Sequence, residues 1–124
     1  MTAFRTSIVI CVVFFAAVAS DLAGASIRSA TTTCPKVTGP KWVVGPLSGT
    51  KYTIVVVGAS FSCGSATKWV KKFVAVTFPT AALSQKLKGP TGYRCASNPD
   101  KNRRAASGNC AISSSNAFSW IISP

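Results

Sequence analysis

The stretch "SCGSATKWVKKFV", residues 62–74, contains three lysines, a tryptophan and a phenylalanine, and its periodicity decides the fold class. At about 100° per residue, its apolar side chains fall within a helical arc of roughly 140°. These side chains are Cys63, Ala66, Trp69, Val70, Phe73 and Val74, and the side chains on the opposite side are Lys68, Lys71 and Lys72. Ser62 is suited to be the N-cap. The pattern predicts an amphipathic helix.

Two kinds of protein contain such a helix. A surface helix that packs on a sheet has this pattern, and so does a cationic helix that lies on a membrane. About three turns are marginal as an isolated helix in water. Cys63 would also tie the apolar side to the rest of the protein. We therefore favour a core helix with a solvated lysine side, and a membrane-active helix is the alternative.

Two β-branched runs precede the helix. "KWVV" (41–44) and "KYTIVVVGA" (51–59) are separated by residues 45–49, which predicts a hairpin with a turn of about five residues. Tyr52, Ile54 and Val56 share one face of the second strand, and the other face is also largely apolar. We therefore expect a central strand that is covered, at least partly, on both faces.

After the helix the signals are weaker. Residues 75–90 are expected to be irregular, whereas "TGYRCA" (91–96), "CAIS" (110–113) and "AFSWII" (117–122) predict strands. The basic, turn-rich stretch 97–109 is expected to contribute nothing to the core. The resulting order, ββαβββ, predicts a two-layer α+β domain in which one amphipathic helix packs on a small antiparallel sheet.

The N-terminus has the features of a secretory signal peptide. Arg5 precedes an apolar run, residues 8–19, and the tripeptide 23–25 (Ala-Gly-Ala) fits a cleavage site. The run is shorter than the ~20 residues that a membrane span needs. We predict a signal peptide over 1–25, a disordered segment over 26–33, a single domain over 34–124, and secretion to the extracellular space. A cut after residue 19 and a retained anchor are alternatives.

Four cysteines remain after residue 25, and in an exported domain they predict two disulfides. Cys34 would lie opposite the end of the second strand, close to Cys63, and Cys95 and Cys110 flank the 96–109 loop symmetrically. We therefore predict Cys34–Cys63 and Cys95–Cys110 among the three possible pairings. Four free thiols would require that the chain is not exported. A zinc site would require all four to converge, because the chain has no histidine.

Composition excludes most catalytic chemistry. The 124 residues include 14 basic and 2 acidic side chains and no histidine, for a formal net charge of +12. After residue 25 the single carboxylate side chain is Asp100, so histidine-based nucleophiles and paired carboxylates are impossible. A Ser-Lys dyad is the remaining alternative, and nothing specifies one. We expect no enzyme activity, no cofactor and no metal.

The segments "FSCGSATKWVKKFV", "GPTGYRC" and "GNC" ahead of a final aromatic strand resemble a group of small, uncharacterised, secreted bacterial proteins of actinobacterial type. Cys34 fits the four-cysteine version of that group, and the likeness covers about residues 34–121. Tyr93 stands where a tryptophan is more usual. The resemblance implies a secreted, disulfide-bonded α+β domain and no assigned activity.

The cationic side chains suggest partners. We expect a non-catalytic domain, a monomer, that binds an anionic polymer or an anionic lipid surface without specific nucleic-acid recognition. The candidate residues lie on two segments expected to be exposed, and they are Lys68, Lys71, Lys72, Lys101, Arg103 and Arg104. The alternatives are a secreted cationic antimicrobial or toxin-like protein, an inhibitor that presents the 96–109 loop, and a charge that serves only solubility.

Overall fold

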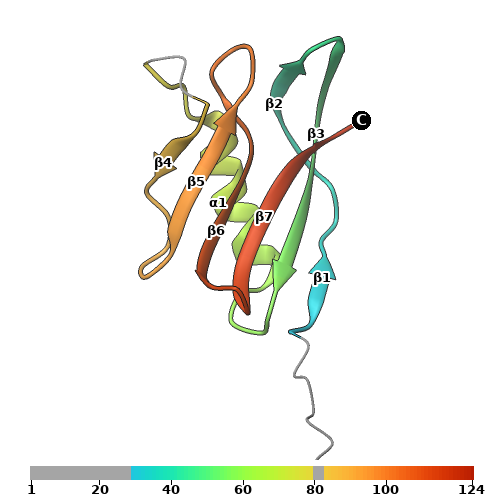
Figure 1. The fold of residues 1–124 in the computed structure, drawn as a ribbon. Helices are drawn as coiled ribbons and strands as arrows, with labels where there is room; N and C mark the ends of the chain where they lie inside the picture. Colours follow the sequence, from blue (N-terminus) through green and yellow to red (C-terminus); the bar gives the residue numbers. More distant parts are fainter. Residues whose placement is uncertain (1–28, 80–82) are drawn as a thin grey trace, which may run out of the picture.

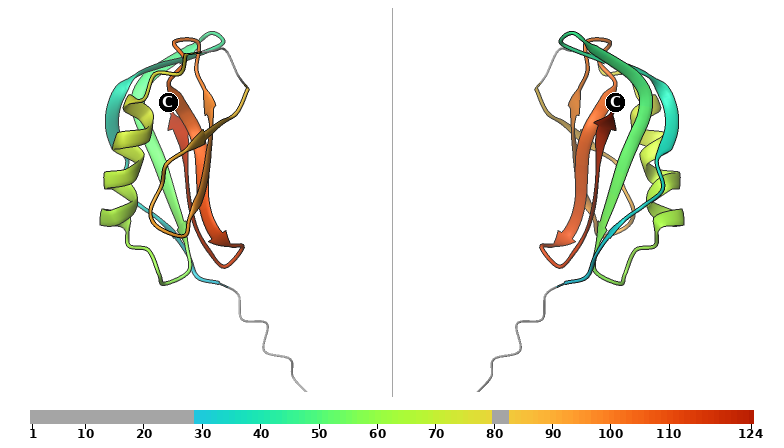
Figure 2. Two further views of the ribbon diagram at one scale, coloured as in Figure 1. Left: turned by 90° about the vertical axis from the view of Figure 1, so that its left-hand side faces the viewer. Right: turned by 90° about the vertical axis from the view of Figure 1, so that its right-hand side faces the viewer.

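The computed structural model describes residues 29–79 and 83–124 (Figure 1). The predicted signal peptide, 1–25, and the first residues of the segment 26–33 lie outside the described residues. The described part forms two layers, with one helix on one face of an antiparallel sheet (Figure 2). This is the predicted α+β arrangement, but the sheet has seven strands where the sequence predicted five.

The chain order is β1, β2, β3, α1 and then β4 to β7. The strands are β1 (Thr31–Thr33), β2 (Val37–Val44), β3 (Leu47–Val57), β4 (Gln85–Leu87), β5 (Arg94–Pro99), β6 (Ala105–Ser113) and β7 (Asn116–Ser123), and the helix is α1 (Cys63–Ala75). Neighbouring strands follow the order β1-β3-β7-β6-β5-β4, and β2 also pairs with β3. The long strand β3 therefore carries both N-terminal strands along one edge and β7 along the other.

Alternation along β3 sets the two faces of the sheet. Tyr52, Ile54 and Val56 are at most 2% exposed and point to α1. The intervening Val55 and Val57 are only partly buried, because within the described residues no element covers that face. The prediction of a central strand is confirmed, and the prediction of cover on both faces is wrong. Apolar β-branched residues also suit a half-exposed face, so composition could not separate the two cases.

The β2–β3 hairpin is tighter than predicted. Its turn consists of Gly45 and Pro46, and Val44 pairs with Leu47. Gly45 has a φ of 57°, which glycine adopts without strain, so a two-residue turn replaces the expected five-residue one. The register of β2 shifts between Thr38 and Trp42, and the Trp42 side chain is fully buried, with its indole N–H donating to the carbonyl of Lys51 at 2.9 Å.

Helix α1 confirms the sequence prediction. The hydroxyl of Ser62 accepts the backbone N–H of Ser65 at 3.2 Å, so the helix begins at its predicted N-cap. The buried residues of α1 are Ala66, Val70, Phe73 and Val74. No helix within 29–79 and 83–124 is long and apolar enough to cross a membrane.

Two short strands were not predicted. Thr31–Thr33, placed by the sequence in a disordered segment, pairs with the end of β3, and Gln85–Leu87 pairs with β5 inside a stretch expected to be irregular. Three polar or mixed residues show no alternation that identifies a strand. Each segment becomes a strand because it pairs with a longer strand, β3 or β5, that lies elsewhere in the sequence. Its own three residues therefore do not predict it.

Residues 97–109 contribute to the core, contrary to the prediction from the sequence. Strand β5 continues to Pro99 and β6 begins at Ala105, and Ala105 and Ala106 are at most 3% exposed. The backbone carbonyl of Ala105 accepts the indole N–H of Trp120 at 2.9 Å. These alanines are small enough to lie beneath bulky neighbours, so a basic, turn-rich stretch still contributes to the core.

Both predicted disulfides are present. Cys34 bonds to Cys63 and Cys95 to Cys110, with Cα–Cα distances of 5.5 and 4.1 Å. Cys95 and Cys110 are direct partners across β5 and β6, as expected from their symmetric places around the loop.

Candidate anion-binding surface

The solvent side of α1 holds three cations. Lys68, Lys71 and Lys72 are all exposed, and they lie opposite the buried residues of the helix. Residues three and four apart on a helix are neighbours, so Lys68 repels both Lys71 and Lys72 by a few tenths of a kcal/mol each. No acidic residue occurs within the helix. The structure thus brings this half of the predicted site together on one surface.

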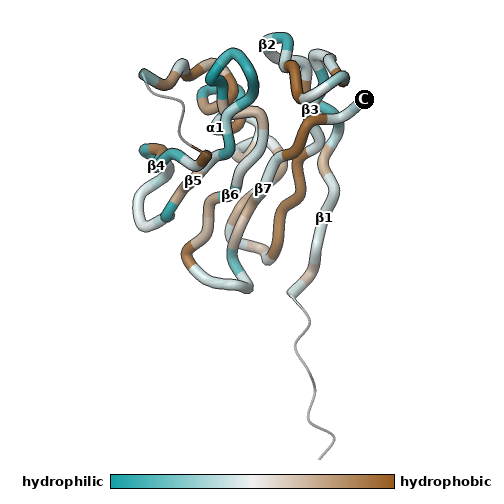
Figure 3. The backbone as a smooth tube through the Cα atoms, turned by 45° about the horizontal axis from the view of Figure 1, so that its top comes forward, coloured by the Kyte–Doolittle hydropathy of each residue, from teal (hydrophilic) through white to brown (hydrophobic). Residues whose placement is uncertain are grey.

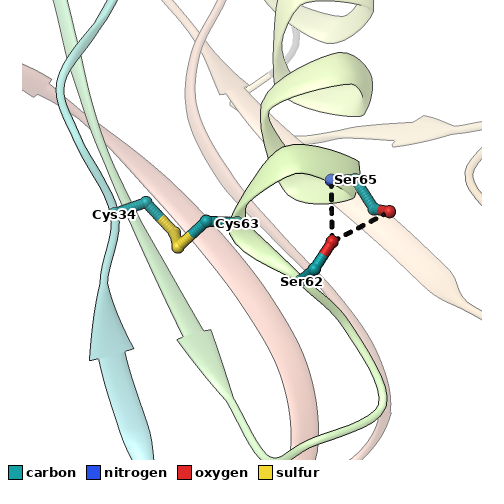
Figure 4. Close-up of a disulfide and its surroundings, with 4 residues drawn as sticks. All are labelled: Cys34, Ser62, Cys63 and Ser65. Atoms are coloured by element: carbon teal, nitrogen blue, oxygen red, sulfur yellow. Dashed lines mark hydrogen bonds between the residues drawn. A yellow bond between two sulfur atoms is a disulfide. The ribbon is translucent and has the colours of Figure 1, made fainter.

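A fourth lysine joins this surface through the disulfide. The Cys34–Cys63 bond holds the start of α1 beside the segment that leads into β2 (Figure 4). Lys36, two residues after Cys34, therefore lies near the helix, and Lys36 and Lys71 line the same shallow hollow of about 470 Å³. We call Lys36, Lys68, Lys71 and Lys72 the helix lysine surface. Lys36 was not among the residues predicted from the sequence, although the predicted Cys34–Cys63 disulfide could have placed it beside the helix.

The loop between β5 and β6 holds the other half of the predicted site. Lys101 and Arg103 are exposed, but Arg104 is only partly exposed, because its guanidinium donates to the carbonyl of Lys41 at 2.8 Å. The guanidinium of Arg103 donates to the carbonyl of Pro79 at 3.0 Å. Both arginines therefore hold the loop against neighbouring segments, and only Lys101 has no such side-chain bond in the described residues.

The loop and the helix meet through the segment that follows α1. Thr77 forms a β-bridge with Arg104, and the N–H of Phe78 donates to the carbonyl of Arg103 at 3.0 Å. The β5–β6 loop is strongly hydrophilic, whereas much of β3 is hydrophobic (Figure 3). The loop lies next to the C-terminal end of α1 but is a separate group of cations.

The single carboxylate in residues 26–124 is turned inward. Asp100 is 8% exposed, and its two carboxylate oxygens accept the backbone N–H groups of Arg104 at 2.9 Å and Val43 at 3.3 Å. The carboxylate is thereby used to join the end of β2 to the β5–β6 loop. The described surface carries twelve lysine and arginine side chains and no exposed side-chain carboxylate.

Reactive groups are few. In residues 29–79 and 83–124, no three His, Cys, Asp or Glu side chains lie together as a metal site would require. Burial raises the pKa of the Tyr52 hydroxyl above its usual value of 10.0, and the nearby Asp100 carboxylate raises it further. This hydroxyl donates to the carbonyl of Pro40 at 2.7 Å and is part of the core.

Comparison with other proteins assigns neither a family nor a function to this chain. No protein-family model, curated protein or solved structure matches this chain. The resemblance to small secreted bacterial proteins therefore stays a prediction, and the function of the chain is inferred from its own residues.

Proposed function

We propose that this protein is a secreted, non-catalytic domain that binds an anionic polymer through the helix lysine surface. The observation that carries this proposal is the position of Asp100. Because Asp100, the one side-chain carboxylate among residues 29–79 and 83–124, is buried and bonded to backbone N–H groups, the exposed lysines of this part have no acidic side chain to pair with. A surface without internal counterions is suited to a partner that supplies the negative charge.

The spacing of the lysines favours a polymer over a single small anion. Four ammonium groups spread along α1 and the adjoining segment do not converge on one buried point, since all four are exposed. Exposed ion pairs contribute only about 0–1 kcal/mol each. A polyanion that makes several such contacts gains from the release of condensed counterions, so its binding should be modest and steeply dependent on salt.

The packing of α1 argues against a membrane-disrupting role. The apolar side of α1 packs into the core, where Val70 is fully buried and Phe73 is 3% exposed. Inserting that side into a bilayer would require the helix to leave the sheet, and the Cys34–Cys63 disulfide opposes this at the start of the helix. Extracellular action is part of the proposal, because two disulfides suit an oxidising compartment.

The proposal is tested by retention of the disulfide-bonded protein on a heparin column in a rising salt gradient. The variant Lys68→Gln/Lys71→Gln/Lys72→Gln should elute at clearly lower salt than the wild type. A control variant removes three charges from the strands instead: Lys41→Gln/Lys51→Gln/Arg94→Gln. It should elute between the two, because it changes net charge equally and leaves the helix lysine surface intact.

Two results would contradict the proposal. Equal shifts for the two variants would mean that retention follows net charge alone, with no localised surface. Unchanged retention of the helix variant would place binding elsewhere, with Lys101 and Arg103 as the next cations to replace. The thermal stability of the helix variant should equal or slightly exceed that of the wild type, because removing like charges relieves repulsion.

A further inference from the structure

A second hollow is lined by residues of the C-terminal half of α1, of the segment that follows it and of β4. Its volume is about 320 Å³. Its walls include three aromatic side chains and three lysines, namely Trp69, Phe73, Phe78, Lys72, Lys86 and Lys88. We call this the helix-end pocket. It lies at the lower end of the size range of small-molecule sites, and those sites are also mostly apolar with a few polar groups.

The aromatic walls of the pocket are held in place by the core. Phe73 and Phe78 are 3% and 5% exposed, and the ring of Phe73 stacks on that of Trp120 with centroids 5.1 Å apart. Trp69 is only partly buried, and its centroid is 5.7 Å from that of Phe73. The apolar wall is thus preformed, so a ligand would not have to order it on binding.

The lysines give the pocket a positive rim. The ammonium group of Lys72 lies 4.7 Å from the ring centroid of Trp69, which places a cation beside the aromatic wall. Lys86 and Lys88 are exposed and flank the partly buried Leu87 on and just after β4. No side-chain carboxylate lines this pocket within the described residues.

The two features together define the ligand class. A small hydrated anion would lose water against the rings of Phe73 and Phe78, which offer it no hydrogen bond, and that loss is unfavourable. A neutral apolar molecule would gain no attraction from the three exposed ammonium groups. We propose that the helix-end pocket binds a small anionic amphiphile, with its ring or short chain against Trp69 and the exposed edges of Phe73 and Phe78, and its acid group between the lysines.

The test uses 8-anilinonaphthalene-1-sulfonate, an aryl sulfonate whose fluorescence rises in apolar surroundings, and its uncharged analogue N-phenyl-1-naphthylamine. The folded protein should bind the sulfonate saturably, at one site per chain, and more tightly than the analogue. Lys86→Gln/Lys88→Gln should weaken binding by roughly three- to tenfold, the loss of two exposed charge contacts. Trp69→Leu should also weaken it. A double variant with the same loss of charge, Lys51→Gln/Arg94→Gln, should bind nearly as the wild type does.

Several outcomes would overturn the inference. These are unsaturable binding, equal affinity for the neutral analogue, or equal weakening by the two double variants. Near-UV circular dichroism must stay native during the titration, because the dye also binds partly unfolded states; a signal that appears only with loss of native dichroism counts against the pocket. Lys86→Gln/Lys88→Gln retains Lys68, Lys71 and Lys72, so failure here leaves the heparin result, and the polymer proposal, separately testable.

Discussion

Replacing Asp100 by asparagine should destabilise the protein although it removes only one charge and leaves the shape of the side chain nearly unchanged. The carboxylate accepts two backbone N–H groups, those of Arg104 and Val43. The amide of asparagine has one oxygen, so one N–H would face an NH₂ group in place of an acceptor. The backbone bonds of residue 100 remain, namely its N–H to the carbonyl of Arg104 at 2.7 Å and its carbonyl to the N–H of Arg103 at 3.0 Å.

The magnitude follows from the single bond that is lost. A hydrogen bond to a charged group contributes about 1.5–3 kcal/mol. We therefore expect Asp100→Asn to lower the free energy of unfolding by about 2 kcal/mol. For a domain of this size, that corresponds to a fall in Tm of roughly 8–16 °C. Asp100→Ala removes both bonds and should cost more.

Urea denaturation of the oxidised protein measures the change. Lys101→Gln is the matched control, because the exposed neighbour changes the charge of the same loop and should alter stability by no more than about 0.5 kcal/mol. The measurement is repeated at high salt, where charge repulsion between exposed groups is largely screened. A loss for Asp100→Asn that disappears at high salt, or a variant as stable as the wild type, would refute the proposed hydrogen-bonding role of the carboxylate.

Three further perturbations test the packing. Replacing Cys34 and Cys63 by serine opens a link between residues 29 apart and should cost about 3–4 kcal/mol in the chain-entropy model, measured by urea denaturation. Gly108→Ala should lower stability by about 1–3 kcal/mol, because an added Cβ would meet the Trp120 ring, and thermal melting reports the loss. Burial raises the pKa of Tyr52, so the folded protein holds that proton more tightly than the unfolded chain does. Its stability should decline as the pH rises above 10.0, and less so in Tyr52→Phe.

The features predicted correctly are those with strong local periodicity or a covalent rule. The helix over residues 63–75 and its lysine side followed from 3.6-residue spacing, and both disulfides followed from the places of the cysteines around expected hairpins. Strands β1 and β4 were missed because Thr31–Thr33 and Gln85–Leu87 acquire their structure from partners far along the chain.

Only part of the candidate site could be predicted from the sequence. Exposure of Lys68, Lys71 and Lys72 could be predicted because the apolar face of the helix fixes the direction of its other face. The side-chain hydrogen bonds of Arg103 and Arg104 could not be predicted from the sequence. Their acceptors are the carbonyls of Pro79 and Lys41, which come close to the loop only in the tertiary fold. The helix-end pocket was equally out of reach, because its walls come from α1, from the segment after it and from β4.

The burial of Asp100 links the stability of the protein to its proposed function. A carboxylate on the surface of so basic a domain would pair with lysines and reduce their attraction for an outside polyanion. Inside, the same group accepts two backbone N–H groups and joins the end of β2 to the β5–β6 loop. The described part of the chain thus uses its one acidic side chain, Asp100, where a hydrogen-bond acceptor is needed. The exposed cations remain free of acidic side-chain partners in the part of the chain that the structure describes, which is the condition that binding of a polyanion requires.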